Sequence, residues 1–139
     1  MTFLNYRFST APMMEWTDRH WRVFARTLTQ KALLYTEMVT APALIHGNLD
    51  RLTQHSTEEY PLALQVGGSD PDELYRATEH VKELGFYEIN LNLGCPSDRV
   101  QAGCFGATLM TDPDRVSECF EAMLNAAGPQ GPHITAKIR

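Results

Sequence analysis

The sequence is short of positive charge. Its 139 residues include 12 Lys and Arg against 17 Asp and Glu, which gives a formal net charge of −5. Modules that bind nucleic acid through their own surface are usually basic. The composition therefore argues against this stretch as a nucleic-acid-binding surface. It does not exclude an enzyme whose phosphate contacts come from another domain.

Long apolar runs are also missing. No run approaches the roughly 20 residues that a membrane-spanning helix needs. Residues 1–7 contain no basic stretch followed by an apolar block, so they do not have the form of a signal peptide. These absences predict a cytoplasmic protein that does not associate with a membrane.

Cysteine is scarce, with only Cys95, Cys104 and Cys119. An odd number of cysteines without an export signal favours free thiols over a disulfide framework. There is no closely spaced Cys-x-x-Cys pair and no paired histidines, so no metal site is predicted. Neither a Walker A pattern nor a G-x-G-x-x-G dinucleotide fingerprint is present.

Short apolar runs alternate with amphipathic segments along the chain. The apolar runs predict strands at about residues 33–39, 62–66, 87–93 and 134–139. The amphipathic segment after Asp70-Pro71 predicts a helix that Gly85 ends, and Asp112-Pro113 opens another helix that Gly128 ends. This alternation predicts parallel βαβ units.

A further helix is expected from about Asp18, capped by Thr17. Its predicted inward face is apolar and consists of Trp21, Phe24, Ala25 and Leu28.

Two folds fit this alternation: a doubly wound open sheet and a TIM (β/α)₈ barrel. Several strands carry a polar residue near their carboxyl end, such as Glu37, Gln65 and Asn92. A barrel builds its active site at that end, whereas strands of an open sheet buried on both faces read as unbroken apolar runs. The prediction is therefore a barrel. A complete barrel takes about 250 residues, so residues 1–139 would form its N-terminal half, about four βα units plus a fifth strand.

Cys95 is the strongest candidate for chemistry. It follows an expected strand and lies between Gly94, which permits unusual backbone angles, and Pro96, which stiffens the turn. An isolated cysteine is more often a small buried hydrophobe, but the loop position and the nearby Asn92 favour function. Core packing is expected for Cys119 and a place in the loop for Cys104.

Lys137 is the second candidate. On the inner face of a barrel strand, its ammonium would need a carboxylate, an anion or a cofactor oxygen as partner. A solvent-facing lysine at a strand end fits the spacing equally well.

The motifs of the chain resemble those of tRNA-dihydrouridine synthases. They follow the same order as in that family: Ala11-Pro-Met13 at the first strand, Thr36-Glu-Met-Val39, Leu64-Gln-Val-Gly-Gly68, Asn90-Leu-Asn-Leu-Gly-Cys-Pro96 and Lys137-Ile-Arg139. The first motif, extended to Trp21, looks like the A subfamily. The Asn-x-Gly-Cys-Pro segment followed by Gly103-x-x-Gly106 is the most specific part.

The resemblance implies an FMN-containing barrel followed by a helical domain. Such enzymes reduce the C5–C6 double bond of particular uridines in the D-loop of tRNA, with NADPH as the source of electrons. Hydride from the flavin reaches C6, and a cysteine protonates C5. Since the base must leave its stack, the pocket reads a flipped nucleotide.

Residue by residue, the resemblance makes Cys95 the general acid. Pro12, Met13 and Met14 would lie along the flavin. Gln65 and Lys137 would bind the isoalloxazine ring, and Asn92 would contact the uridine.

Two alternatives remain open. One is an FMN barrel that reduces a free pyrimidine, and the other is a truncated, non-catalytic half-barrel. Barrels usually hold the flavin phosphate in loops after strands 7 and 8. We therefore expect residues 1–139 alone to bind FMN poorly and to be almost inactive, with the rest of the barrel and the helical domain absent. Nothing in the sequence indicates an oligomeric state.

Overall fold

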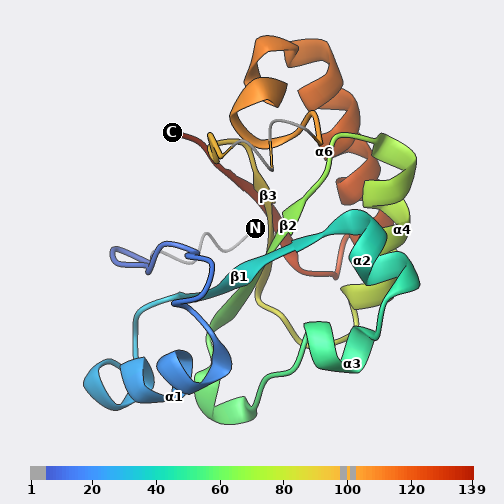
Figure 1. The fold of residues 1–139 in the computed structure, drawn as a ribbon. Coiled ribbons are helices and arrows are strands. Elements are labelled where there is room, and N and C mark those ends of the chain that lie inside the picture. The colour runs from blue at the N-terminus through green and yellow to red at the C-terminus, as the bar shows by residue number, and fades with distance from the viewer. Residues whose placement is uncertain (1–5, 98–99, 101–102) are drawn as a thin grey trace.

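The computed structural model describes residues 6–97, 100 and 103–139, and it contains a parallel sheet of four strands (Figure 1). The strands pair in chain order, each with the next, as β1 (Leu34–Thr40), β2 (Leu62–Gly67), β3 (Glu88–Asn92) and β4 (His133–Lys137). Because all four strands are parallel, their carboxyl ends lie side by side at the same end of the sheet.

Helices cover one face of the sheet (Figure 1). The helices that lie wholly within the described residues are α1 (Arg19–Leu28), α2 (Ala41–His46), α3 (Leu49–Leu52), η1 (Thr57–Glu59), α4 (Pro71–Val81), η2 (Gly106–Thr111) and α6 (Pro113–Ala127). α4 packs between α2 and α6 on that face. Within the described residues, no helix is both long and apolar enough to cross a membrane.

Alternating parallel strands and helices confirm the predicted α/β class, and the open sheet is half of a (β/α)₈ barrel. The predicted first strand is wrong at Ala11-Pro-Met13. Just before this motif, Ser9 makes an isolated parallel bridge to Leu33, and the chain then turns. Pro12 has no N–H to give to a ladder, and the Met13 carbonyl accepts from the Thr17 N–H at 2.9 Å, closing a turn in place of a strand.

The two best-marked helices begin as predicted, but α4 ends at Val81, before the predicted stop at Gly85. Asp70 accepts a hydrogen bond from the Glu73 N–H at 3.0 Å, and Asp112 accepts one from the Arg115 N–H at 3.1 Å. Their inner faces enter the core between helices and sheet, which includes Leu64, Leu74, Ala77, Val81, Ile89, Leu91, Cys119 and Met123. These apolar contacts are the main source of stability for the half-barrel.

The first helix differs from its prediction in cap and face. Asp18, not Thr17, caps α1, since its carboxylate accepts from the Trp21 N–H at 2.7 Å. Ala25 is buried, but Phe24 and Leu28 are 60% and 74% exposed. The helical spacing of these residues predicted one core face, whereas in the structure the buried residues of α1 are Arg22 and Ala25.

An arginine points inward from α1, which its sequence did not suggest. The Arg22 Nε donates to the Glu59 carboxylate at 2.6 Å, and the two side chains are only 5% and 0% exposed. The guanidinium also donates to the carbonyl oxygens of Thr17 and Gln54. This buried ion pair joins α1 to η1. Removing one partner would leave an uncompensated buried charge.

We expect Arg22→Ala to lower the free energy of unfolding by about 3–5 kcal/mol. Urea denaturation followed by circular dichroism measures this loss. The exposed Arg51 provides a matched control, and Arg51→Ala should change the free energy by less than about 0.5 kcal/mol.

Replacing the whole pair by apolar residues, Arg22→Met with Glu59→Leu, should restore part of the stability because no charge then stays buried alone. Equal, small losses for Arg22→Ala and Arg51→Ala would show that the ion pair does not stabilise the fold.

Candidate functional site

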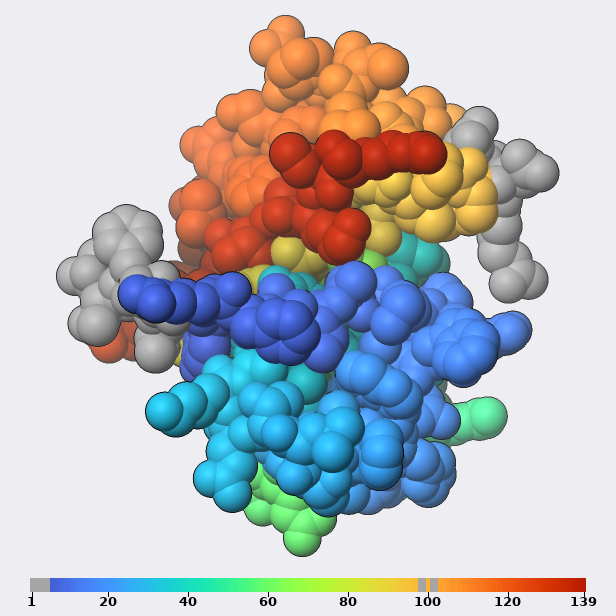
Figure 2. Space-filling view, turned by 90° about the vertical axis from the view of Figure 1, so that its left-hand side faces the viewer, coloured from blue at the N-terminus to red at the C-terminus, as the bar shows by residue number. Residues whose placement is uncertain are grey.

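A pocket of about 470 Å³ lies at the carboxyl ends of the strands. Its lining residues come from the N-terminal segment, from all four strands or the loops that follow them: Pro12, Met14, Met38, Gln65, Asn92, Gly94, Cys95, Pro96, Ser97 and Lys137. In the space-filling view, the N-terminal segment and β4 lie on facing sides of this hollowed face (Figure 2). The sequence-predicted site residues thus meet in one place, except for Met13.

The backbone around Cys95 is held by one side chain. Asn92 Oδ1 accepts from the N–H groups of Gly94, at 3.2 Å, and Cys95, at 3.0 Å. The Cys95 carbonyl in turn accepts from the Ala107 N–H at 3.0 Å. The loop therefore carries Cys95 in a fixed position at the end of β3.

The thiol of Cys95 is partly exposed to the pocket, and its sulfur lies 3.3 Å from the Ser97 hydroxyl oxygen. Ser97 was not predicted as a site residue. Its place two residues after Cys95 was the only signal for it in the sequence. A hydroxyl at this distance can hydrogen-bond the thiol and limit the directions in which it points.

The amide groups of Gln65 and Asn92 are joined. Asn92 Nδ2 donates to Gln65 Oε1 at 2.9 Å, and Gln65 Nε2 donates to Asn90 Oδ1 at 2.9 Å. Gln65 is 1% exposed. Gln65 and Asn92, both predicted to bind ligand, therefore use much of their hydrogen-bonding capacity on neighbouring protein groups.

Lys137 presents an ammonium group to the same pocket. Its side chain is exposed, and Nζ makes a long contact of 3.5 Å with the Ile138 carbonyl. Within the described part of the chain, no carboxylate lies in ion-pair distance of Lys137. Gly94 allows the residues that follow β4 to pass close to the Cys95 loop, because a Cβ at position 94 would lie 3.0–3.2 Å from the backbone of Ile138 and Arg139.

The apolar side of the pocket is only partly the predicted one. Pro12 and Met14 line it, whereas Met13 does not. Met38 also lines it, whereas Glu37, the polar residue noted near that strand end, does not. The register of β1 against β2 shifts between Tyr35 and Met38, which changes the face on which the following side chains lie.

Residues 9–139 match the family model described as "Dihydrouridine synthase (Dus)". The chain belongs to the dihydrouridine synthase family. Several curated relatives carry the name "tRNA-dihydrouridine(20/20a) synthase". The protein from Xanthomonas axonopodis pv. citri is 61% identical over 120 residues, which cover 86% of this chain and 36% of the relative.

The relative from Shewanella oneidensis is 58% identical over 120 residues, covering 86% of this chain and 36% of the relative. The one from Yersinia pestis is 57% identical over 133 residues, covering 96% and 37%. The chain thus spans about a third of the length of these curated relatives.

The other two thiols of the chain have different surroundings. Cys119 is fully buried in the core, and burial raises the pKa of its thiol to about 11. Cys104 is exposed and has a positive φ of 54°, next to Gly103. Neither lines the pocket that contains Cys95.

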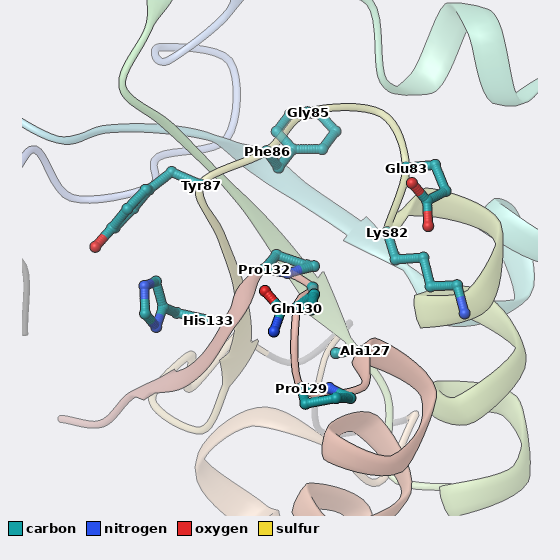
Figure 3. Close-up of a pocket in the computed structure, with 11 residues that line it drawn as sticks. Lys82, Glu83, Gly85, Phe86, Tyr87, Ala127, Pro129, Gln130, Pro132 and His133 are labelled. Carbon is teal, nitrogen blue, oxygen red and sulfur yellow. The ribbon is translucent and has the colours of Figure 1, made fainter. Parts of the chain in front are cut away.

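A second hollow lies at the opposite, amino ends of β3 and β4 (Figure 3). The ring of His133 lies beside that of Tyr87, with centroids 4.9 Å apart. The nearby ammonium of Lys82 already bonds to the Glu79 carboxylate and to the Ala126 carbonyl. None of the residues that characterise the family's motifs lies here, so the pocket around Cys95 is the candidate site.

Gly106 allows the close packing under Cys95. Its φ is +66°, and a Cβ there would lie 2.6 Å from the Cys95 carbonyl oxygen and 2.5 Å from Val100 Cγ1. Gly128 has nearly the same φ, +69°, but nothing lies within 4 Å of its virtual Cβ. Both glycines therefore have a positive φ that favours glycine, but only Gly106 also has close steric neighbours.

We expect Gly128→Ala to cost about 1–3 kcal/mol of unfolding free energy from backbone strain alone, because φ +69° with ψ 178° is essentially confined to glycine. Gly106→Ala should cost more, by about 1–3 kcal/mol, since the loop must also move away from the added methyl group. Urea denaturation of the two variants gives the difference. Equal costs would mean that the loop accommodates a side chain without moving the Cys95 carbonyl.

Proposed function

We propose that this chain forms the N-terminal part of a flavin-binding TIM barrel, and that the barrel is a tRNA-dihydrouridine synthase of the cytoplasm. It would reduce the C5–C6 double bond of specific D-loop uridines in tRNA, with NADPH as the source of electrons. One observation carries the proposal. Cys95, Lys137, Gln65 and Asn92 line a single pocket with Pro12 and Met14.

The lining of the pocket suits FMN. Pro12 and Met14 offer apolar contact to a flat ring, while Gln65 and Lys137 offer polar groups to its edge. The Lys137 ammonium has no carboxylate partner among the described residues and is thus available to stabilise negative charge on the ring. When bound, FMN supplies the hydride that the reduction needs.

Cys95 is the proposed general acid for C5 of the uracil. The sulfur opens onto the pocket, and the loop around it is held by Asn92 and by the Ala107 N–H. A hydrogen bond with the Ser97 hydroxyl group limits the directions in which the thiol points. A thiol that is fixed in this way can present its proton to one face of a bound base.

The proposed substrate is a uridine in tRNA, flipped out of its stack into the pocket. The names of the relatives include positions 20 and 20a, which we extend to this chain as the proposed targets. We propose that Asn92 contacts the uridine with the hydrogen-bonding capacity that Gln65 and the loop leave free. With a net charge of −5, the chain offers little to the tRNA backbone. The phosphate contacts would then come from other parts of the polypeptide.

The visible absorption spectrum tests the flavin proposal. We expect the purified 139-residue chain to retain little FMN, whereas a chimera that continues it with the remaining part of the Shewanella oneidensis relative should purify with bound flavin. The chain supplies the ring contacts, and a barrel normally holds the phosphate in later loops. Absence of flavin from a folded chimera would contradict the proposed function.

The role of Cys95 is tested in the same chimera. We expect Cys95→Ala to lower the rate of dihydrouridine formation in tRNA by about 10²–10⁴-fold, because proton transfer by a positioned acid contributes that much. Cys104→Ser is the matched control and should retain activity, since Cys104 does not line the pocket. Mass spectrometry of digested tRNA detects the product.

Free uridine should not be reduced at a comparable rate by the same preparation. Reduction of free uridine as fast as that of tRNA would favour the alternative enzyme class, a barrel for small pyrimidines.

A further inference from the structure

A row of hydrogen bonds runs along β3, from its amino end to its carboxyl end, and includes side chains of β1, β2 and β4. At its amino end, the hydroxyl groups of Tyr35 and Thr135 both donate to Oε1 of Glu88, the latter at 2.6 Å. Asn90 Nδ2 then donates to the Thr135 oxygen at 2.7 Å. Glu88 is buried, and no cation lies within ion-pair distance of it among the residues that the structure describes.

The row continues through the amides to the loop of the candidate site. Asn90 Oδ1 accepts from Gln65, and Gln65 Oε1 accepts from Asn92. Asn92 Oδ1 ends the row by accepting from the N–H groups of Gly94 and Cys95. Every hydrogen bond in the row points the same way, from the loop of Cys95 toward the carboxylate of Glu88.

This common direction follows from the two ends. A carboxylate can only accept hydrogen bonds, and a backbone N–H can only donate one. A carboxamide in between is nearly symmetric in shape and can turn over, exchanging its oxygen for its NH₂ group. Glu88 forces Thr135 to donate to it, which leaves the Thr135 oxygen to accept from Asn90. The orientations of Asn90 and Gln65 are then determined.

The Tyr35 hydroxyl supports this end of the row. Burial and its hydrogen bond to Glu88 raise the pKa of Tyr35 well above its ordinary value, so the group keeps the proton that it donates. A second donor to the same oxygen helps to stabilise a buried carboxylate that lacks a cation.

We propose that Glu88 is a remote positioning residue of the candidate site. Through Thr135, its carboxylate selects the orientation of the amides of Asn90 and Gln65, and so the atoms that Gln65 offers to Asn92 and to the pocket. The link to catalysis rests on the proposed function of Cys95. The orientation of the amides does not, and it can be measured in the chain without flavin or tRNA.

Reversing the row tests the proposal. Gln65→Glu places an acceptor-only group opposite Asn90 Oδ1, so the Asn90 amide must turn over and offer its oxygen to Thr135. Thr135 has one proton for two acceptors, Asn90 and Glu88. We expect the melting temperature of the chain to fall by roughly 5 °C or more, as for a buried acceptor that loses its partner.

Adding Glu88→Gln should then restore most of this loss. The NH₂ group of a glutamine at position 88 can donate to the oxygens of both Thr135 and Tyr35, and Thr135 can give its proton to the turned Asn90. The bonds between positions 65 and 88 are then made in the opposite direction, while those from Gly94 and Cys95 through Asn92 to position 65 keep theirs. In the protein that keeps Gln65, the same Glu88→Gln substitution should lower the melting temperature slightly. Its effect on the melting temperature is therefore opposite in the two proteins.

Two controls separate orientation from charge. Glu83→Gln removes an exposed carboxylate and should not rescue Gln65→Glu. Thr135→Val removes the hydroxyl that transmits the orientation, so Glu88→Gln should no longer rescue in that background. Rescue that persists without the hydroxyl would reflect relief of charge repulsion between residues 65 and 88, and would overturn the proposal.

Alkylation of Cys95 by iodoacetamide, followed by peptide mass spectrometry, connects the row to the thiol. Thr135→Val should raise the rate for Cys95 severalfold by loosening the loop, while the exposed Cys104 keeps its rate. An unchanged alkylation rate for Cys95 would show that the row of hydrogen bonds does not influence the thiol. Failure of the double variant to fold, when Glu88→Gln alone folds, would also overturn the proposal.

Discussion

The candidate site depends on the two hydrogen bonds that the Asn92 side-chain oxygen accepts from the backbone N–H groups of Gly94 and Cys95. These bonds join the end of a buried strand to the loop that carries the thiol. An asparagine can do this because its oxygen accepts two N–H groups at once while its nitrogen remains free to donate. That nitrogen bonds to Gln65, and so the position of the loop is coupled to the neighbouring strand.

A polar row on the inner face of the sheet is costly unless each member finds a partner, because an unpaired buried polar atom loses its contact with water. Here each side-chain amide forms a hydrogen bond with a polar side chain on the neighbouring parallel strand. Gln65 lies opposite Asn90 in the register of β2 and β3, and Asn90 lies opposite Thr135 in β3 and β4. The register of the sheet therefore determines which polar side chains meet.

Much of this arrangement could be predicted from the sequence. Cap residues such as Asp70 and Asp112 mark their helices by local chemistry, and the polar residues at strand ends indicated a barrel. In parallel strands, residues before the carboxyl ends converge whatever lies between them in the chain. The proximity of Gln65, Cys95 and Lys137 follows from that topology together with the motifs of the family.

The sequence by itself determined the class of fold, the two strongest helices and the family, because periodicity, caps and motifs act over short stretches of chain. The tertiary structure decided the rest. It buried Arg22 against Glu59, 37 residues away, and left Phe24 and Leu28 exposed. It also brought Met38, not Glu37, into the lining of the pocket, and it gave the side-chain amides their common hydrogen-bond direction. These outcomes depend on register and on partners distant in sequence, which no local pattern encodes.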